Sequence, residues 1–164
     1  MSFEISHAAP SDLPAIAAIW NKVIRESSAT FTDEEKTLEG LREWLAQREA
    51  ASEAVLVARD GPDCIAFAAY FPFRGGRGYR FTKELTIYVA EGQQGSGLGT
   101  TLLKSLEVDA KSKGIHSLWA GCSATNPGSI RFHARQGYAE IARLPAVGYK
   151  FGKWIDLILM QKRL

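Results

Sequence analysis

The sequence predicts an α/β domain in which helices cover a mixed β-sheet. Runs of alternating or β-branched residues recur along the chain, separated by segments with the apolar spacing of helices. In order they give the pattern β-αα-ββ-β-α-β-α-ββ, which is typical of a layered α/β fold. The 164 residues are 46% hydrophobic, and no linker, repeat or low-complexity segment divides them. We therefore expect residues 1–164 to fold as a single domain around a sizeable core.

The first half of the chain contains two amphipathic segments between its strands. Ser11 is a suitable cap for a helix that continues to about Glu26, because Leu13, Ile16 and later apolar residues recur at helical spacing. Thr37 is expected to open a second helix. The strands of this half are expected at residues 3–5, 54–58, 64–71 and 81–89, the last one after an arginine-bearing loop at residues 73–80.

The second half begins with a helix that follows a glycine-rich turn. This helix is expected from Leu98 onward, with Gly114 as its C-cap. Asn126, which precedes a proline, starts a short helix that ends near Gln136. Glycines and a proline at residues 145–153 indicate a loop between the last two strands. Strands are expected at residues 117–121, 138–143 and 154–162.

The composition argues against several classes of partner. A net charge of +2 with scattered Lys and Arg offers no basic run for nucleic acid or for a membrane surface. No apolar run approaches the ~18 residues that span a bilayer, and the N-terminus lacks a secretory signal pattern. Cys64 and Cys122 are far apart and lack a metal-binding spacing. We therefore expect reduced thiols, no metal site and a cytoplasmic location.

The most informative stretch is residues 88–100, Tyr-Val-Ala-Glu-Gly-Gln-Gln-Gly-Ser-Gly-Leu-Gly-Thr, which joins a strand to a helix. The first N–H groups of a helix are unpaired and lie at the positive end of its dipole, so such a turn suits an anion. A P-loop is excluded because no Gly-Lys-Ser/Thr follows. A dinucleotide fingerprint is excluded because Thr100 replaces its third glycine. A turn with glycines for steric reasons alone stays open.

Two motifs carry a resemblance to a known superfamily. Gln94-x-x-Gly97-x-Gly99 after a Tyr-Val strand end resembles the acyl-CoA motif of the Gcn5-related N-acetyltransferases (GNAT), and residues 126–138 resemble the motif that follows it. The resemblance implies the GNAT fold, in which a mixed central sheet has helices on both faces and a splayed strand pair holds acetyl-CoA. Further segments resemble the phosphinothricin/methionine sulfoximine acetyltransferases: Trp20-Asn21, residues 28–31, Arg74, residues 82–89 and residues 148–157.

The resemblance implies an enzyme that moves the acetyl group of acetyl-CoA to a primary amine. The expected acceptor is a small amino acid or an analogue of the phosphinothricin or methionine sulfoximine type. Two alternatives remain, an acetyltransferase for protein N-termini or another amine, and a non-catalytic acyl-CoA-binding module. The resemblance also implies a homodimer.

The resemblance also assigns a cofactor half of the site. Backbone N–H groups of residues 95–100 would hold the CoA pyrophosphate, while Ile87, Tyr88 and Val89 flank the pantetheine. The Val89 N–H would polarise the thioester carbonyl, a role worth ~3 kcal/mol per donor. Asn126 has the alternative role of helix cap. The expected cofactor-binding residues are Ile87, Tyr88, Val89, Gln94, Gly95, Ser96, Gly97, Leu98, Gly99, Thr100, Asn126 and Ser129.

The acceptor half centres on Glu84, the expected catalytic base, together with Val89 as the oxyanion donor. A primary amine must lose a proton before it attacks. Glu84 lies about 16 Å along the strand from Val89, at ~3.3 Å per residue, so the proton is expected to pass through water. An ordinary exposed strand carboxylate is the alternative reading.

Other residues are expected around the acceptor. The Arg74 guanidinium suits an acidic group of the substrate, and Phe31 is expected to wall the pocket. His133 stands where many superfamily members have a tyrosine, and its role as acid or as packing residue stays open. Lys150 either rims the substrate site or packs against a second subunit. The expected substrate-binding residues are Phe31, Arg74, Gly75, Gly76, Glu84, Leu85 and Thr86.

Overall fold

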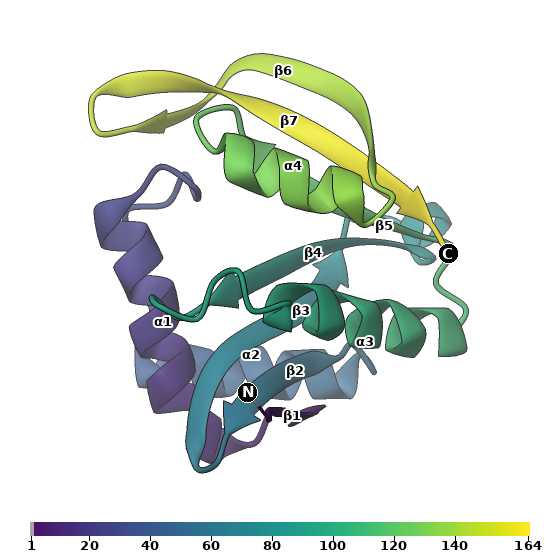
Figure 1. The fold of residues 1–164 in the computed structure, drawn as a ribbon. Helices are drawn as coiled ribbons and strands as arrows, with labels where there is room; N and C mark the ends of the chain where they lie inside the picture. The colour runs from purple at the N-terminus through teal and green to yellow at the C-terminus, as the bar shows by residue number, and fades with distance from the viewer. Residues whose placement is uncertain (1) are drawn as a thin grey trace.

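The computed structural model describes residues 2–164 as a seven-stranded sheet with helices on both faces (Figure 1). The strand order is β1-β2-β3-β4-β5-β7-β6, and every neighbouring pair is antiparallel except β4–β5. The elements are β1 (Glu4–His7), the 3-10 turn η1 (Pro10–Asp12), α1 (Leu13–Glu26), α2 (Leu38–Ala50), β2 (Val55–Asp60), β3 (Asp63–Pro72), the 3-10 turn η2 (Arg77–Tyr79), β4 (Thr82–Val89), α3 (Leu98–Ser112), β5 (Ser117–Ser123), α4 (Pro127–Arg135), β6 (Ala139–Lys150) and β7 (Lys153–Arg163).

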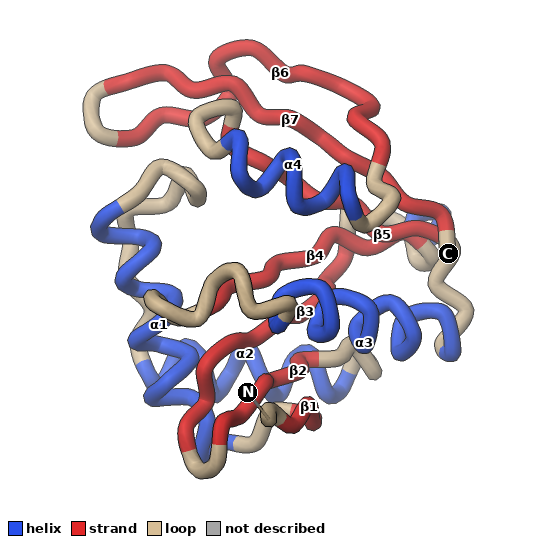
Figure 2. Tube along the Cα trace, viewed as in Figure 1, coloured by secondary structure: helices blue, strands red, loops and turns tan. Residues whose placement is uncertain are grey.

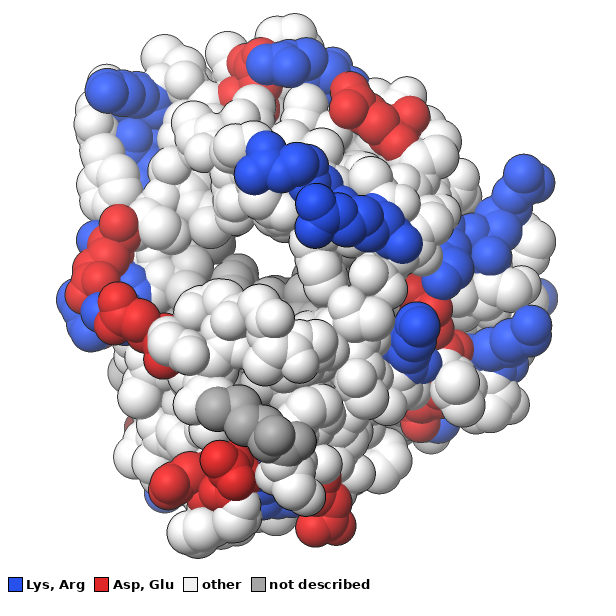
Figure 3. All heavy atoms as spheres, viewed as in Figure 1, with Lys and Arg blue, Asp and Glu red and all other residues white. Residues whose placement is uncertain are grey.

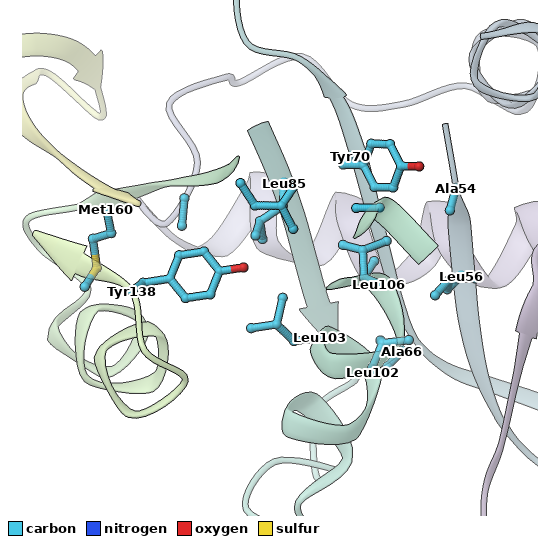
Figure 4. Packing of buried hydrophobic residues seen from close by; sticks show 14 of the residues in the cluster. Ala54, Leu56, Ala66, Tyr70, Leu85, Leu102, Leu103, Leu106, Tyr138 and Met160 are labelled. Carbon is cyan, nitrogen blue, oxygen red and sulfur yellow. The ribbon is translucent and has the colours of Figure 1, made fainter. Parts of the chain in front are cut away.

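The core consists of two apolar layers, one on each face of the sheet. On one face α1 and α2 pack on β2 and β3, where Phe67 is fully buried. On the other face the leucines of α3 pack on the sheet, and Figure 4 shows Leu103, Leu106 and Leu85 converging there. Successive residues of a strand point to opposite faces. Leu85 of β4 accordingly joins the α3 layer, whereas Tyr88 joins the α1 layer.

The parallel strands β4 and β5 pair only along one end of their length. Its register runs from Thr82 opposite Ser117 to Leu85 opposite Ala120, and no pairing continues beyond that point. The rest of the two strands diverges, and Figures 1 and 2 show β4 and α4 on opposite sides of the resulting gap. The splayed strand pair expected from the GNAT resemblance is therefore present.

The prediction of a loop at residues 145–153 is wrong, because most of that segment belongs to a long β6–β7 hairpin. The ladder is interrupted between Leu144 and Gly148, where Pro145 has no N–H to donate and Ala146 has φ 51°. Pairing then resumes with Gly148 opposite Ile155. The chain reverses only at Phe151 and Gly152, both with positive φ, as two-residue hairpin turns require. The proline and glycines mark a bulge and a turn rather than a loop.

The predicted cap at Ser11 is also wrong. Ser11 lies inside η1, and α1 begins after Asp12, whose buried carboxylate makes no cap hydrogen bond to α1. Asp12 accepts a hydrogen bond from the Ala9 N–H at 2.7 Å and pairs with Arg59 at 2.5 Å. Thr37, in contrast, caps α2 as expected, because its hydroxyl accepts from the Gly40 N–H at 3.0 Å. None of the helices described in residues 2–164 is long and apolar enough to cross a membrane.

Candidate active site

The divergence of β4 from β5 opens a cleft of about 930 Å³. Its walls are β4, the glycine turn, the start of α4 and the first residues after α1. Figure 3 shows a hollow with an uncharged wall, and Lys and Arg atoms gather along its upper rim. Arg135 of α4 is among the lining residues. An apolar cleft with a positive rim suits a long ligand that carries negative charge.

The β4 backbone presents a free edge to this cleft. The Ala90 N–H donates to the Ile65 carbonyl of β3 at 2.8 Å, and the Phe73 N–H donates to the Thr82 carbonyl. Backbone groups of alternate residues point to opposite sides of an antiparallel strand. The N–H and C=O groups of Ile87 and Val89 therefore point away from β3, toward the splay. An extended molecule with amide groups can pair with this edge as another strand would.

The glycine turn adjoins that edge and leads into α3. Gly97 is the N-cap of α3 with φ 81°, and Gly95 also has φ 81°, a conformation that favours glycine. No atom lies within 4 Å of the place a Cβ would occupy on either residue, so the cleft is open in front of them. Gln94 braces the turn, because its side chain accepts from the Gly92 N–H at 3.0 Å and donates to the Val89 carbonyl at 3.4 Å.

The start of α4 forms the opposite wall. Asn126 caps the helix, because its Oδ1 accepts from the Ser129 N–H at 3.1 Å. Both residues line the cleft. The cap fixes the Asn126 side chain at the wall, so capping and ligand contact are compatible roles.

His133 is buried behind Ser129 and lines the same cleft. Its Nδ1 lies 2.9 Å from the Ser129 carbonyl oxygen, which can only accept, so Nδ1 carries the proton. Burial lowers the pKa of His133 and favours the neutral ring. Its Nε2 has no hydrogen-bond partner within residues 2–164 and is an acceptor in this tautomer. The ring also packs edge-on against Phe132 and Tyr138.

Glu84 is half-buried on β4, opposite Trp119 of β5. Its carboxylate lies against Gly121, where an added Cβ would stand 3.1 Å from Oε1. Burial raises the pKa of Glu84. Gly121 lines the cleft whereas Glu84 does not, so the carboxylate is next to the cleft wall rather than inside it. This position fits the expectation that Glu84 acts through water. Sequence reasoning missed Gly121, although a lone glycine within a strand often marks a close approach.

All of the expected cofactor residues line the cleft except Ser96 and Leu98, and Leu98 is buried in the core. The expected acceptor residues are separated. Leu85 and Thr86 line the cleft, whereas Phe31, Arg74, Gly75 and Gly76 do not. The last three lie on the exposed loop after β3. The Arg74 guanidinium lies 5.9 Å from the ring of its neighbour Phe73, which in turn stacks on Trp119. Phe31 instead covers Gly148 of β6, where a Cβ would overlap its ring.

Metal chemistry has no candidate ligand set in the described part of the chain. Residues 2–164 contain no group of three His, Cys, Asp or Glu side chains placed to hold an ion. Cys64 and Cys122 are both free thiols.

Comparison with known proteins identifies the family. The L-methionine sulfoximine/L-methionine sulfone acetyltransferase of Pseudomonas aeruginosa is 35% identical over 165 aligned residues, which cover 100% of this chain and 96% of that protein. A crystal structure described as a ribosomal-protein-alanine N-acetyltransferase from Brucella melitensis is 40% identical with a TM-score of 0.95, covering 98% of this chain and 99% of that one. An acetyltransferase structure from Salmonella typhimurium with its cofactor acetyl-CoA is 33% identical with a TM-score of 0.96, covering 100% of this chain and 95% of that chain. The model of the acetyltransferase (GNAT) family matches residues 16–138. Together with the splayed strands and the glycine turn, these matches establish that the chain belongs to the acetyltransferase (GNAT) family.

Proposed function

We propose that residues 1–164 form one acetyl-CoA-dependent N-acetyltransferase domain, which acetylates the primary amine of a small amino acid or analogue. The observation that carries the proposal is the continuity of one cleft, in which the free β4 edge leads directly into the glycine turn. Acetyl-CoA has the same order of parts, with a thioester and two amides followed by a pyrophosphate. The comparison with a methionine sulfoximine acetyltransferase supports this acceptor class.

The residues of the cleft suit acetyl-CoA part by part. The pantetheine amides pair with the backbone of Ile87 and Val89, while Tyr88 flanks them from the other face. The pyrophosphate binds the N–H groups of Leu98, Gly99 and Thr100, which have no partner inside α3. Gln94, Gly95, Ser96 and Gly97 shape this cradle, and Asn126 and Ser129 contact the cofactor from α4.

The same geometry supports a direct transfer to the amine. Acetyl-CoA supplies an activated thioester carbonyl. The Val89 N–H donates to the carbonyl oxygen as negative charge develops on it. Glu84 accepts the amine proton through water, and its raised pKa makes it a better base than an exposed glutamate. The CoA thiol has a pKa of ~8.5, so the thiolate leaves without a dedicated acid. His133 is neutral and holds its proton toward Ser129, so it is not the acid in this scheme.

The acceptor site is proposed beside Glu84, Leu85 and Thr86, with Phe31 and the loop of Arg74, Gly75 and Gly76 at its edge. A second candidate acceptor is a protein N-terminus, which the similarity to the Brucella melitensis structure favours. An alanine N-terminus and a free amino acid share the primary amine but differ in the carboxylate that Arg74 would bind. This difference makes the two acceptors separable by experiment.

A substrate panel tests the proposal. We expect kcat/KM to be highest for methionine sulfoximine or phosphinothricin and at least about tenfold lower for a peptide with N-terminal alanine, since a site built for a charged group rejects analogues that lack it. The reverse order would favour the protein acceptor. Acetyl-CoA, but not NAD or ATP, should raise the melting temperature. Acetyl-CoA binding without turnover of any amine would leave only the non-catalytic module.

The assembly and location are also proposed. Tyr149, Phe151 and Trp154 of the β6–β7 hairpin are 57%, 60% and 68% exposed, which is unusual for aromatic side chains and supports a homodimer through this hairpin. A molecular mass near 18.0 kDa in light scattering would refute the dimer. The free thiols of Cys64 and Cys122 suit the reducing cytoplasm.

A further inference from the structure

Lys150 is a buried lysine near the end of the β6–β7 hairpin, only 3% exposed. Its Nζ donates to two backbone carbonyls, that of Ser27 at 2.7 Å and that of Thr30 at 2.9 Å. Ser27 is the C-cap of α1, so the ammonium also lies at the negative end of the helix dipole. The charge therefore faces inward and holds the backbone of the segment that follows α1.

Two further contacts hold the same segment, which comprises residues 27–31. The ring of Phe31 covers Gly148, and only the missing side chain of that glycine leaves room for it. The Ser28 hydroxyl lies 2.6 Å from the hydroxyl of Thr125, which follows β5. Both contacts join residues 27–31 to segments on the β5–β7 side, β6 and the turn after β5.

This arrangement bridges the two sides of the cleft. Residues 27–31 follow α1, which packs on the β2–β3 side, whereas Lys150, Gly148 and Thr125 belong to the β5–β7 side. Figure 1 shows the connection after α1 beside the free end of the β6–β7 hairpin, at one end of the gap. Ser27 and Ser28 line the cleft themselves. A shift of residues 27–31 therefore changes the wall of the cleft that Ser27 and Ser28 form.

We propose that Lys150 is a positioning residue for acetyl transfer, which fixes residues 27–31 at the wall of the cleft and so shapes the acceptor site. The inference rests on the proposed function. The proposed pyrophosphate donors Leu98, Gly99 and Thr100 begin α3, whereas Lys150 holds Ser27 and Thr30. The loss of Lys150 therefore disturbs the amine acceptor and leaves pyrophosphate binding in place. A purely structural lysine would lower stability without changing the KM of one substrate relative to the other.

The test is steady-state kinetics of Lys150→Met, which keeps most of the side-chain volume and removes the three donors. We expect the acceptor KM to rise about tenfold, because a displaced wall costs binding and alignment, while the acetyl-CoA KM changes by less than about twofold. Lys111→Met is the control, because Lys111 is an exposed lysine on α3, outside the hairpin that is proposed as the dimer interface. It should behave as the wild type does.

Gly148→Ala provides a second route if Lys150→Met does not fold. The new methyl pushes Phe31 and the segment away while Lys150 stays intact, and the same rise in acceptor KM is expected. An unchanged acceptor KM in a folded Lys150→Met or Gly148→Ala protein overturns the inference. If the wild type acetylates no amine, the proposed function itself fails, and that result is distinct from an active enzyme that tolerates both changes.

Discussion

The contact between Glu84 and Gly121 makes Gly121→Ala a sensitive probe of the proposed base. The new Cβ would stand 3.1 Å from Oε1, whereas ordinary contact begins at 3.4 Å, so the carboxylate must retreat by about 0.3 Å. A misplacement of ~1 Å can cost ~100-fold in rate, and in proportion a shift of ~0.3 Å costs roughly fourfold. The methyl also removes water from Glu84, which raises its pKa further.

The assay follows release of the CoA thiol over a range of pH. We expect kcat/KM of Gly121→Ala to fall roughly fourfold at its optimum, with the acid limb of the profile shifted to higher pH. Gly121 has no positive φ, so alanine fits the backbone and the free energy of unfolding should stay within ~1 kcal/mol of the wild type. Gly78→Ala is the control, because nothing lies within 4 Å of its Cβ position. A wild-type rate and pH profile in Gly121→Ala would refute the placement of the base beside Gly121.

Two further predictions concern stability. Burial raises the pKa of Glu84 above its ordinary 4.5, so its contribution to stability is complete below that pH and is lost as the pH rises through the folded value. Glu84→Gln should therefore be more stable than the wild type at pH 7, and chemical denaturation at pH 4 should show the difference shrinking; equal stability at pH 7 would contradict the burial argument. The buried Glu53 accepts hydrogen bonds from Arg48 at 2.5 Å and Lys83 at 2.6 Å. Glu53→Gln leaves Arg48 and Lys83 without a counter-charge and should lower the free energy of unfolding by about 3 kcal/mol in urea denaturation. A loss below ~1 kcal/mol would mean that these ion pairs contribute no more than exposed surface pairs do.

Much of the fold follows from local patterns in the sequence. The period of the apolar residues predicts α1, α2 and α3, and Thr37 acts as the cap that its position suggests. The length of the last hairpin could not be read in this way, because Pro145 and Gly148 are loop signals unless a partner strand absorbs the bulge. Local chemistry also favoured Ser11 as a cap, but α1 begins after Asp12, whose carboxylate is held by Arg59 and by the Ala9 N–H and makes no cap hydrogen bond to α1. Both errors arise where tertiary contacts override local preference.

The cofactor half of the site could be predicted better than the acceptor half for a related reason. Residues 87–100 are contiguous, so a strand, a turn and a helix place them without help from the rest of the chain. The proposed acceptor half draws on distant segments. Phe31 meets Gly148, and the buried ammonium of Lys150 meets residues 27–30, pairs that no spacing in the sequence connects.

The free edge of β4 has a consequence for how much this protein can change. A ligand that completes the sheet at Ile87 and Val89 is recognised through main-chain groups, which every residue except proline provides. The side chains of these two residues point into the α3 layer and are selected by packing there. A ligand at this edge is therefore held by the backbone geometry of β4. Substitutions of Ile87 or Val89 by other apolar residues that keep this backbone geometry should keep its binding.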